Sequence, residues 1–153
     1  MKKQKGFSLI ELLIVVAIIL IIAAIAIPNL LKASISANES SAVGSVRTLT
    51  TANVQYAAQC PNLGFPAGLA NIGGVAGDCT GAGIIDAVLQ SGTKSGYTVK
   101  YTALGVAPIA TYTLTASPVT VGVTGQRGFF SDQTGVIRYN QSGAATAADP
   151  SLQ

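Results

Sequence analysis

An uncharged apolar run near the N-terminus is the feature that most constrains this chain. From Leu12 to Leu31 no residue is charged, and most are Leu, Ile, Val or Ala. Twenty such residues in a helix measure about 30 Å, which is the thickness of the hydrocarbon core of a bilayer. The sequence therefore predicts a membrane-spanning helix, and it leaves roughly a hundred residues for a globular domain.

Basic residues ahead of this run predict its orientation. The net charge is +3, from nine basic and six acidic residues, but Lys2, Lys3 and Lys5 all lie within the first five positions. Under the positive-inside rule they keep the N-terminus in the cytoplasm, and the chain after the run is exported. The other six basic residues (9 − 3) form no cluster, so a specific nucleic-acid partner is not predicted.

Two cleavage sites are compatible with this N-terminus. Ala24-Ile25-Ala26 has the A-x-A form of a secretory signal site, and cleavage after it would release a soluble protein. The alternative is removal of residues 1–6 after Gly6, with the apolar helix retained. Glu11 favours the second alternative, because a discarded signal peptide gains nothing from a carboxylate, whereas a retained helix can use it to meet a partner.

The stretch KGFSLIELLIVVAIILIIAAIAIPNL resembles the N-terminal signature of type IV pilins and type II secretion pseudopilins. The shared features are a short basic leader ending in Gly, then Phe, a Glu five residues into the mature chain, and an apolar helix interrupted by Pro. A weaker resemblance links GQRGFFSDQTGVIRYN to the C-terminal hairpin of some pilin-like proteins.

This resemblance implies a processing and assembly route. A prepilin peptidase would cut between Gly6 and Phe7, and the new amine of Phe7 would be N-methylated. Glu11 matches the assembly carboxylate of the family, and Pro28 matches the helix kink. The implied partners are further copies of the chain in a helical homopolymer, the peptidase, the assembly platform in the inner membrane, and lipid before assembly.

Glu11 itself has two interpretations. In a bundle of identical helices its carboxylate can face the Phe7 amine of a neighbour, which lowers the cost of burying the charge. Alternatively, the carboxylate interacts with the positive end of its own helix dipole and extends toward the headgroups.

Beyond the apolar run the helix is predicted to continue as an amphipathic segment, so that it extends from Phe7 to about residue 58. Pro28 and Gly44 are points where it can bend. Apolar positions recur at helical spacing and predict the buried face: Ile35, Ala42, Val46, Leu49, Ala52 and Tyr56.

The remaining sequence predicts an α+β fold, with the long helix packed on a small antiparallel meander. A Gly-rich loop with one helical turn near residues 84–90 comes first, and the C-terminal segment 144–153 is expected to be disordered or loosely docked. The strands are expected at YTVKYTAL, ATYTLTAS, RGFFS and GVIRYN, with SDQTG as a hairpin connection. The predicted segments are residues 1–6 (leader), 7–31 (membrane and filament core), 32–59 (amphipathic helix), 60–95 (loop), 96–141 (sheet) and 142–153 (tail).

Cys60 and Cys79 are the two cysteines, and both follow the apolar run. An even number of cysteines on the exported side indicates a disulfide, with free thiols as the alternative. Zinc is not expected, because the chain has no histidine and no third cysteine.

The sequence gives little support for catalysis or a cofactor. Histidine-based triads are excluded, and no paired carboxylates or phosphate-binding loop occur. Asp132 with Gly135 resembles the region where major pseudopilins carry calcium, but Asp-x-x-Gly is first of all a turn.

Three functions are considered, and the resemblance to pilins and pseudopilins implies the first two. The first is a structural type IV pilus subunit, located in the inner membrane as a precursor and then in an extracellular pilus, with a role in adhesion, motility or DNA uptake. The second is a pseudopilin of a type II secretion system in a periplasmic pseudopilus. The third, from another class, is a monomeric binding domain anchored by its helix.

Overall fold

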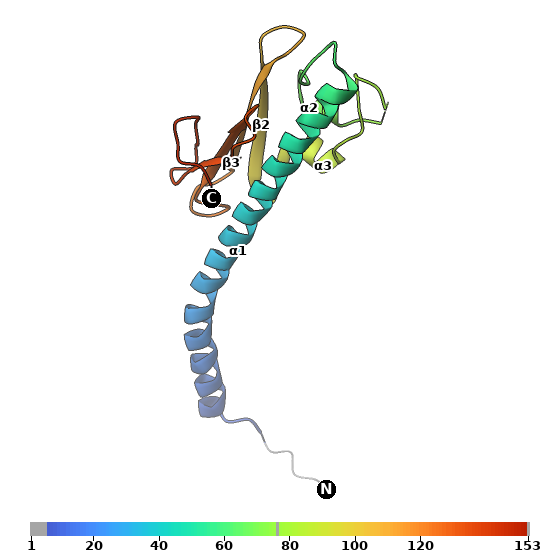
Figure 1. The fold of residues 1–153 in the computed structure, drawn as a ribbon. Helices are drawn as coiled ribbons and strands as arrows, with labels where there is room; N and C mark the ends of the chain where they lie inside the picture. The colour runs from blue at the N-terminus through green and yellow to red at the C-terminus, as the bar shows by residue number, and fades with distance from the viewer. Residues whose placement is uncertain (1–5, 76, 153) are drawn as a thin grey trace. The chain divides into compact units, whose positions relative to one another are not determined.

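The computed structural model describes residues 6–75 and 77–152, and it begins with one long helix. Helix α1, Leu9–Gln59, is continuous through both Pro28 and Gly44 (Figure 1). It ends where Pro61 follows, since a proline disfavours helical geometry in the residue before it. The chain divides into two compact units, residues 1–34 and residues 35–153.

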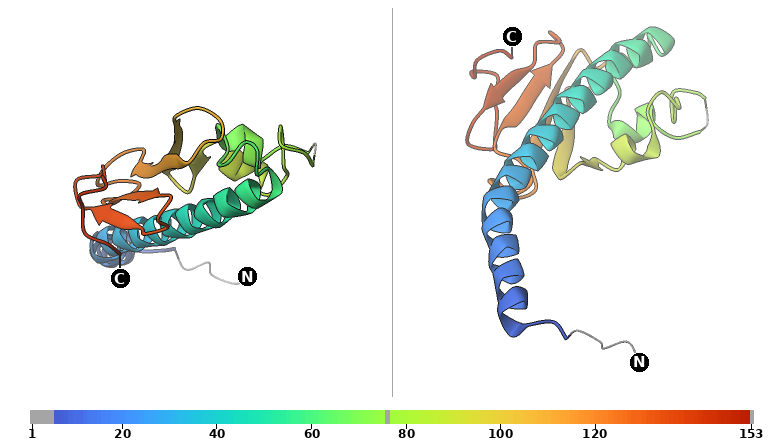
Figure 2. Two further views of the ribbon diagram at one scale, coloured as in Figure 1. Left: turned by 45° about the horizontal axis from the view of Figure 1, so that its top comes forward. Right: turned by 90° about the horizontal axis from the view of Figure 1, so that it is seen from below.

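The second unit contains a five-stranded sheet that follows the helix in the chain. Neighbouring strands are antiparallel and their order in space is their order in sequence, which is a meander (Figure 2). The predicted α+β class is therefore confirmed. The strands are β1 Thr93–Lys94, β2 Tyr97–Leu104, β3 Thr111–Pro118, β4 Gly128–Asp132 and β5 Arg138–Asn140.

Strand β1 was not expected from the sequence. It is two residues long and joins β2 through Ser95 and Gly96, whose φ angles are 49° and 71°. Positive φ at both central residues is the geometry of a two-residue hairpin turn. The sheet therefore begins before residue 96, and its first strand is too short to produce an alternating pattern.

The core of the second unit lies between α1 and the sheet. The predicted helical stripe is confirmed for five of its six positions. Ile35 is half-buried, and the buried positions are Ala42, Val46, Leu49, Ala52 and Tyr56. Along β3 every second side chain is buried, as expected for a strand with one face toward a helix. The sheet contributes the large fully buried side chains Tyr97, Tyr112, Leu114 and Phe129.

The Gly-rich segment contains two short helices, α2 Leu69–Ile72 and α3 Ala87–Gln90. Helix α3 lies in the region predicted to form a helical turn, and the carboxylate of Asp86 caps it by accepting a 2.7 Å hydrogen bond from Leu89 N. Helix α2 was not predicted, because its four residues are too few to show a helical period.

The expectation of a disordered or loosely docked C-terminal segment is wrong for residues 144–152. Their backbone runs along β5, with hydrogen bonds from Tyr139 N to Pro150 O at 3.1 Å and from Leu152 N to Ile137 O at 2.7 Å. The carboxylate of Asp149 accepts further bonds from Asn140 Nδ2 and Thr146 N, both at 2.7 Å. Backbone pairing and one carboxylate hold a segment whose composition offers little apolar surface.

Candidate functional site

The site predicted at the N-terminus is built on the start of α1. Leu12 N donates to Ser8 O at 3.2 Å, which makes Ser8 the residue that caps the helix. The carboxylate of Glu11 reaches back and its Oε2 accepts a 2.9 Å bond from Ser8 N. This is the carboxylate half of a capping box, in which a Glu three residues after a Ser satisfies a free N–H.

This cap corrects the predicted start of the helix. The helix was expected to begin at Phe7, one turn before Glu11, but it begins at Leu9. In the uncleaved chain, Phe7 therefore lies before the first residue of the helix, Leu9. The signal that shows this is the Ser8-x-x-Glu11 spacing, which sequence reasoning missed because it considered Glu11 only as a charge.

The predicted cleavage point lies in non-helical chain just before the cap. Gly6 and Phe7 are both exposed, and Phe7 keeps 78% of its surface accessible. A Cβ atom added at Gly6 would meet no atom within 4 Å, so the fold itself does not require glycine there. Exposed, non-helical backbone is what a peptidase needs. Lys2, Lys3 and Lys5 of the leader lie outside the described residues.

The helix that follows has exposed apolar side chains among the residues that the structure describes. Its most apolar 18-residue window has a mean hydropathy of 3.3 and contains no buried residue. The large apolar residues from Leu9 to Leu31 are exposed all around the helix. This part of α1 is apolar on every side, and by length and composition it can cross a membrane.

Pro28 lies within this apolar part of α1 and removes one helical N–H. One residue later, the side chain of Asn29 bonds to the backbone, with Nδ2 donating to Ile25 O at 3.1 Å. This bond satisfies the side-chain NH2 of Asn29 inside an apolar segment. No other described residue bonds to that side chain. The kink at Pro28 stays a prediction.

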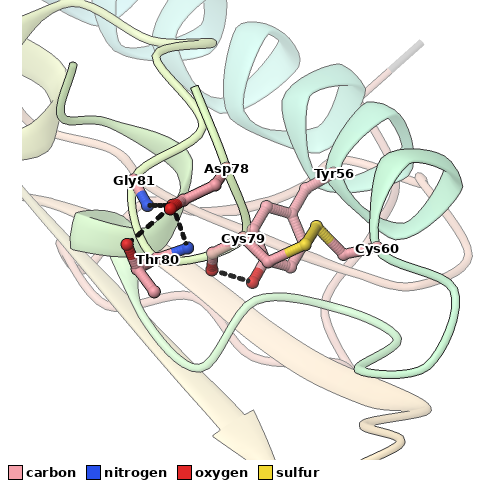
Figure 3. Close-up of a disulfide and its surroundings, with 6 residues drawn as sticks. All are labelled: Tyr56, Cys60, Asp78, Cys79, Thr80 and Gly81. Atoms are coloured by element: carbon pink, nitrogen blue, oxygen red, sulfur yellow. Dashed lines mark hydrogen bonds between the residues drawn. A yellow bond between two sulfur atoms is a disulfide. The ribbon is translucent and has the colours of Figure 1, made fainter. Parts of the chain in front are cut away.

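The predicted disulfide is confirmed. Cys60 and Cys79 are bonded, with their Cα atoms 6.0 Å apart (Figure 3). Tyr56 OH donates to Cys79 O at 2.7 Å, so the last turn of α1 holds the same loop a second time. Asp78 accepts bonds from Thr80 and Gly81, and the bonds from Thr80, the largest influence, lower the pKa of Asp78.

Asp132 and Gly135, the weak calcium candidates, form a turn. Asp132 Oδ1 accepts a 2.9 Å bond from Thr134 N, Gly135 N donates to Asp132 O at 3.0 Å, and Gly135 has φ of 75°. Within residues 6–75 and 77–152, no three His, Cys, Asp or Glu side chains gather as metal ligands would.

An ion pair that the sequence did not reveal joins α1 to the sheet. Glu39 is 6% exposed, its Oε1 accepts Gln126 N and Arg127 N at 3.0 Å each, and its Oε2 accepts Arg127 Nε at 2.7 Å. Burial raises the pKa of Glu39, but the donors from Arg127 and Gln126 together outweigh burial and lower it. Tyr97 OH donates to Arg127 O at 2.7 Å, and burial raises the pKa of Tyr97 to about 12.

Comparison with known proteins identifies the N-terminal part most clearly. A family model described as a prokaryotic N-terminal methylation motif matches residues 1–27. The chain is 62% identical over 40 residues to the type IV wide pilus major component PilA4 of Thermus thermophilus, covering 26% of this chain and 30% of that protein. It is 48% identical over 54 residues to the type IV major pilin protein PilA of Myxococcus xanthus, covering 35% and 24%.

A longer match extends into the globular unit. The type IV major fimbrial protein FimA of Dichelobacter nodosus is 39% identical over 109 residues, covering 64% of this chain and 62% of FimA. Each match spans less than two thirds of the relative's own length, and no solved structure matches the chain significantly. The chain therefore carries a prokaryotic N-terminal methylation motif, and over part of its length it is similar to proteins named as type IV pilins.

Proposed function

We propose that this chain is a structural subunit of a type IV pilus. It is inserted in the inner membrane as a precursor, a prepilin peptidase cuts it between Gly6 and Phe7, and the amine of Phe7 is methylated. The assembly platform in the inner membrane then adds it to a filament of identical subunits on the cell surface, which serves adhesion, motility or DNA uptake. The named relatives and the methylation motif support this proposal.

The observation that carries the proposal is the uncovered apolar helix from Leu9 to Leu31 with one carboxylate at its start. In a bilayer the helix surface is covered by lipid, and in a filament it is covered by neighbouring helices. Since lipid tails are as apolar as these side chains, exchanging one cover for the other gives little free energy. A polar contact that exists only between subunits therefore favours assembly over the membrane-inserted state.

Glu11 can supply that contact without giving up its cap. Its Oε2 accepts the bond from Ser8 N, whereas no described residue donates to Oε1. Cleavage after Gly6 creates an ammonium group on Phe7, and the ammonium of an adjacent subunit can approach Oε1. Pairing of the two charges offsets their desolvation and fixes the axial register of the two helices.

The proposal is tested by shearing cells and sedimenting the released material. A strain that lacks only this chain is the control. Long filaments that contain the chain, and that disappear in the control, support a pilus subunit. Short assemblies confined to the periplasm indicate a pseudopilin, and recovery of the chain only as a bilayer-bound or soluble monomer indicates a tethered binding domain.

A further inference from the structure

One amide in the core of the second unit is buried without a hydrogen-bond partner. Asn53 lies on α1 between Leu49 and Tyr56, and 0% of its surface is exposed. Neither Nδ2 nor Oδ1 of Asn53 bonds to any residue that the structure describes. A buried amide left unpaired is costly, and folded proteins contain few such groups. The side chain of Asn53 therefore points to a partner that does not belong to the described chain.

Three hydroxyl groups share this part of the core. Ser131 of β4 is paired with Leu114 of β3, so their side chains lie on the same face of the sheet. Tyr112 precedes Leu114 by two residues and lies on that face as well, and both Tyr112 and Ser131 are buried. Thr50 lies on α1 one helical turn before Asn53. The helix and two strands thus bring four polar side chains into one apolar core.

The four groups lie near one another without forming good direct bonds. Thr50 Oγ1 and Ser131 Oγ are 3.5 Å apart, whereas two bonded hydroxyls are usually about 2.7 to 2.8 Å apart. The single hydroxyl proton of Thr50 is already used, because Thr50 Oγ1 donates to Val46 O at 2.9 Å. A long polar contact beside an unpaired amide is the arrangement that a bridging water completes.

The hydroxyl of Tyr112 belongs to the same group. Burial raises the pKa of Tyr112, and the side chains of Asn53 and Thr50 beside its hydroxyl oppose that shift. Asn53 is therefore near the Tyr112 hydroxyl, although neither amide atom forms a direct hydrogen bond with it.

The chemistry of these side chains selects water as the ligand. The amide and the three hydroxyls are all uncharged, so they offer no counter-charge to an ion. Together they present donors and acceptors, and a water molecule has two of each. Buried waters typically make about three hydrogen bonds to polar groups that are otherwise unsatisfied.

We propose that an internal water molecule is bound between α1 and the sheet, where it bridges the amide of Asn53 to the hydroxyls of Tyr112 and Ser131. The site lies within the globular unit and does not depend on the proposed function. It also favours one placement of α1 on the sheet. Turning the helix by one residue, about 100°, would move the amide away from the water and the hydroxyls and leave it buried and unpaired.

A crystal structure of the full chain in detergent, at a resolution that shows ordered water in the protein interior, tests the site. The expected result is a density peak about 2.7 to 3.2 Å from an amide atom of Asn53 and from the hydroxyl oxygen of Tyr112 or Ser131. A core without this peak overturns the inference, whether the amide stays unpaired or bonds directly to one of the hydroxyls.

Two variants test whether Asn53 is a ligand of this water. Asn53→Leu keeps a similar side-chain shape but has no polar side-chain atom, and the peak should disappear. Ser45→Ala is the matched control, because Ser45 is also buried on α1 but its hydroxyl already donates to Ser41 O at 2.9 Å, and the peak should remain.

A peak that stays beside Tyr112 and Ser131 in Asn53→Leu would contradict the assignment of Asn53. Circular dichroism shows whether each variant is folded. The wild-type structure decides whether the water is present even where a variant does not fold.

Discussion

Glu39 and Arg127 are 88 residues apart in the sequence and are joined by a 2.7 Å bond from Arg127 Nε to Glu39 Oε2. The same carboxylate accepts the backbone N–H of Arg127, so it holds both ends of one residue. The guanidinium carbon also lies 5.8 Å from the ring centre of Phe129 and 5.7 Å from that of Tyr139. The contact fixes the start of the amphipathic half of α1 to the entry of β4.

Glu39→Ala is expected to destabilise the globular unit by about 3 kcal/mol, because it leaves three donors without their acceptor. Denaturant unfolding of the full chain in detergent, followed by circular dichroism, measures the change. Ser40→Ala, at the exposed position next in the helix, is the control and should unfold like the wild type. An unchanged midpoint for Glu39→Ala would show that the contact contributes nothing to stability.

The pH dependence of stability should contain a contribution from Glu39. Its pKa is lower in the folded chain than the ordinary value of 4.5, so its stabilising effect is complete above that value. As the pH falls below 4.5 through the folded pKa, the carboxylate takes up a proton and the effect is lost. Asp78 and Asp149 also have lowered pKa values, so the measurement is the difference between wild type and Glu39→Gln.

The free energies of unfolding of the two proteins are measured between pH 3 and pH 7. Each value has an uncertainty of about half a kcal/mol. We expect the gap between wild type and Glu39→Gln to shrink toward acid pH. A gap that is constant across the range would show that the charge of Glu39 has no part in it.

Cys60→Ser is expected to weaken the globular unit by about 3 kcal/mol without preventing membrane insertion. The insertion signal is complete before residue 32, whereas the disulfide joins two cysteines that are 19 positions apart in the globular unit. Limited proteolysis should show new cleavage between residues 60 and 80. The double variant Cys60→Ser with Cys79→Ser controls for the free thiol, and unchanged protease resistance in both would argue against a stabilising disulfide.

Cleavage after Gly6 and methylation of Phe7 determine the mass expected for the mature chain. We expect the mass of residues 7–153 plus one methyl group, with the cysteines oxidised. The physical reason is that Gly6 and Phe7 lie in exposed, non-helical chain, whereas Ala24-Ile25-Ala26 lies inside α1. Intact-mass spectrometry decides between them, and a mature chain that begins at Ile27 would support the secretory signal instead.

Periodic and local signals were predictable from the sequence. The apolar run and the stripe from Ala42 to Tyr56 repeat at helical spacing, and β2 and β3 alternate over eight residues each. Ser8-x-x-Glu11 was equally local, and the capping box could have been found from its spacing.

Long-range pairing was not predictable. The composition of residues 144–152 does not show that their backbone pairs with β5, and nothing near Glu39 in sequence indicates Arg127. Strand β1 depends on a partner for its existence, because two residues have no pattern of their own. These features depend on contacts between segments that are far apart in the sequence. A single sequence contains no local pattern from which such contacts can be predicted.

We propose that the charge of Glu11 drives subunit docking, and the bond between its carboxylate and Ser8 N allows a direct test. Glu11→Gln keeps an oxygen that can accept the bond from Ser8 N but removes the charge, whereas Glu11→Ala removes both. Each variant is expressed as the sole copy, and processed chain is quantified in sheared filaments and in the inner membrane. We predict that both variants are inserted and cut after Gly6, yet remain in the membrane as processed monomer. Filaments of Glu11→Gln at the wild-type level would contradict the claim and assign Glu11 to helix capping alone.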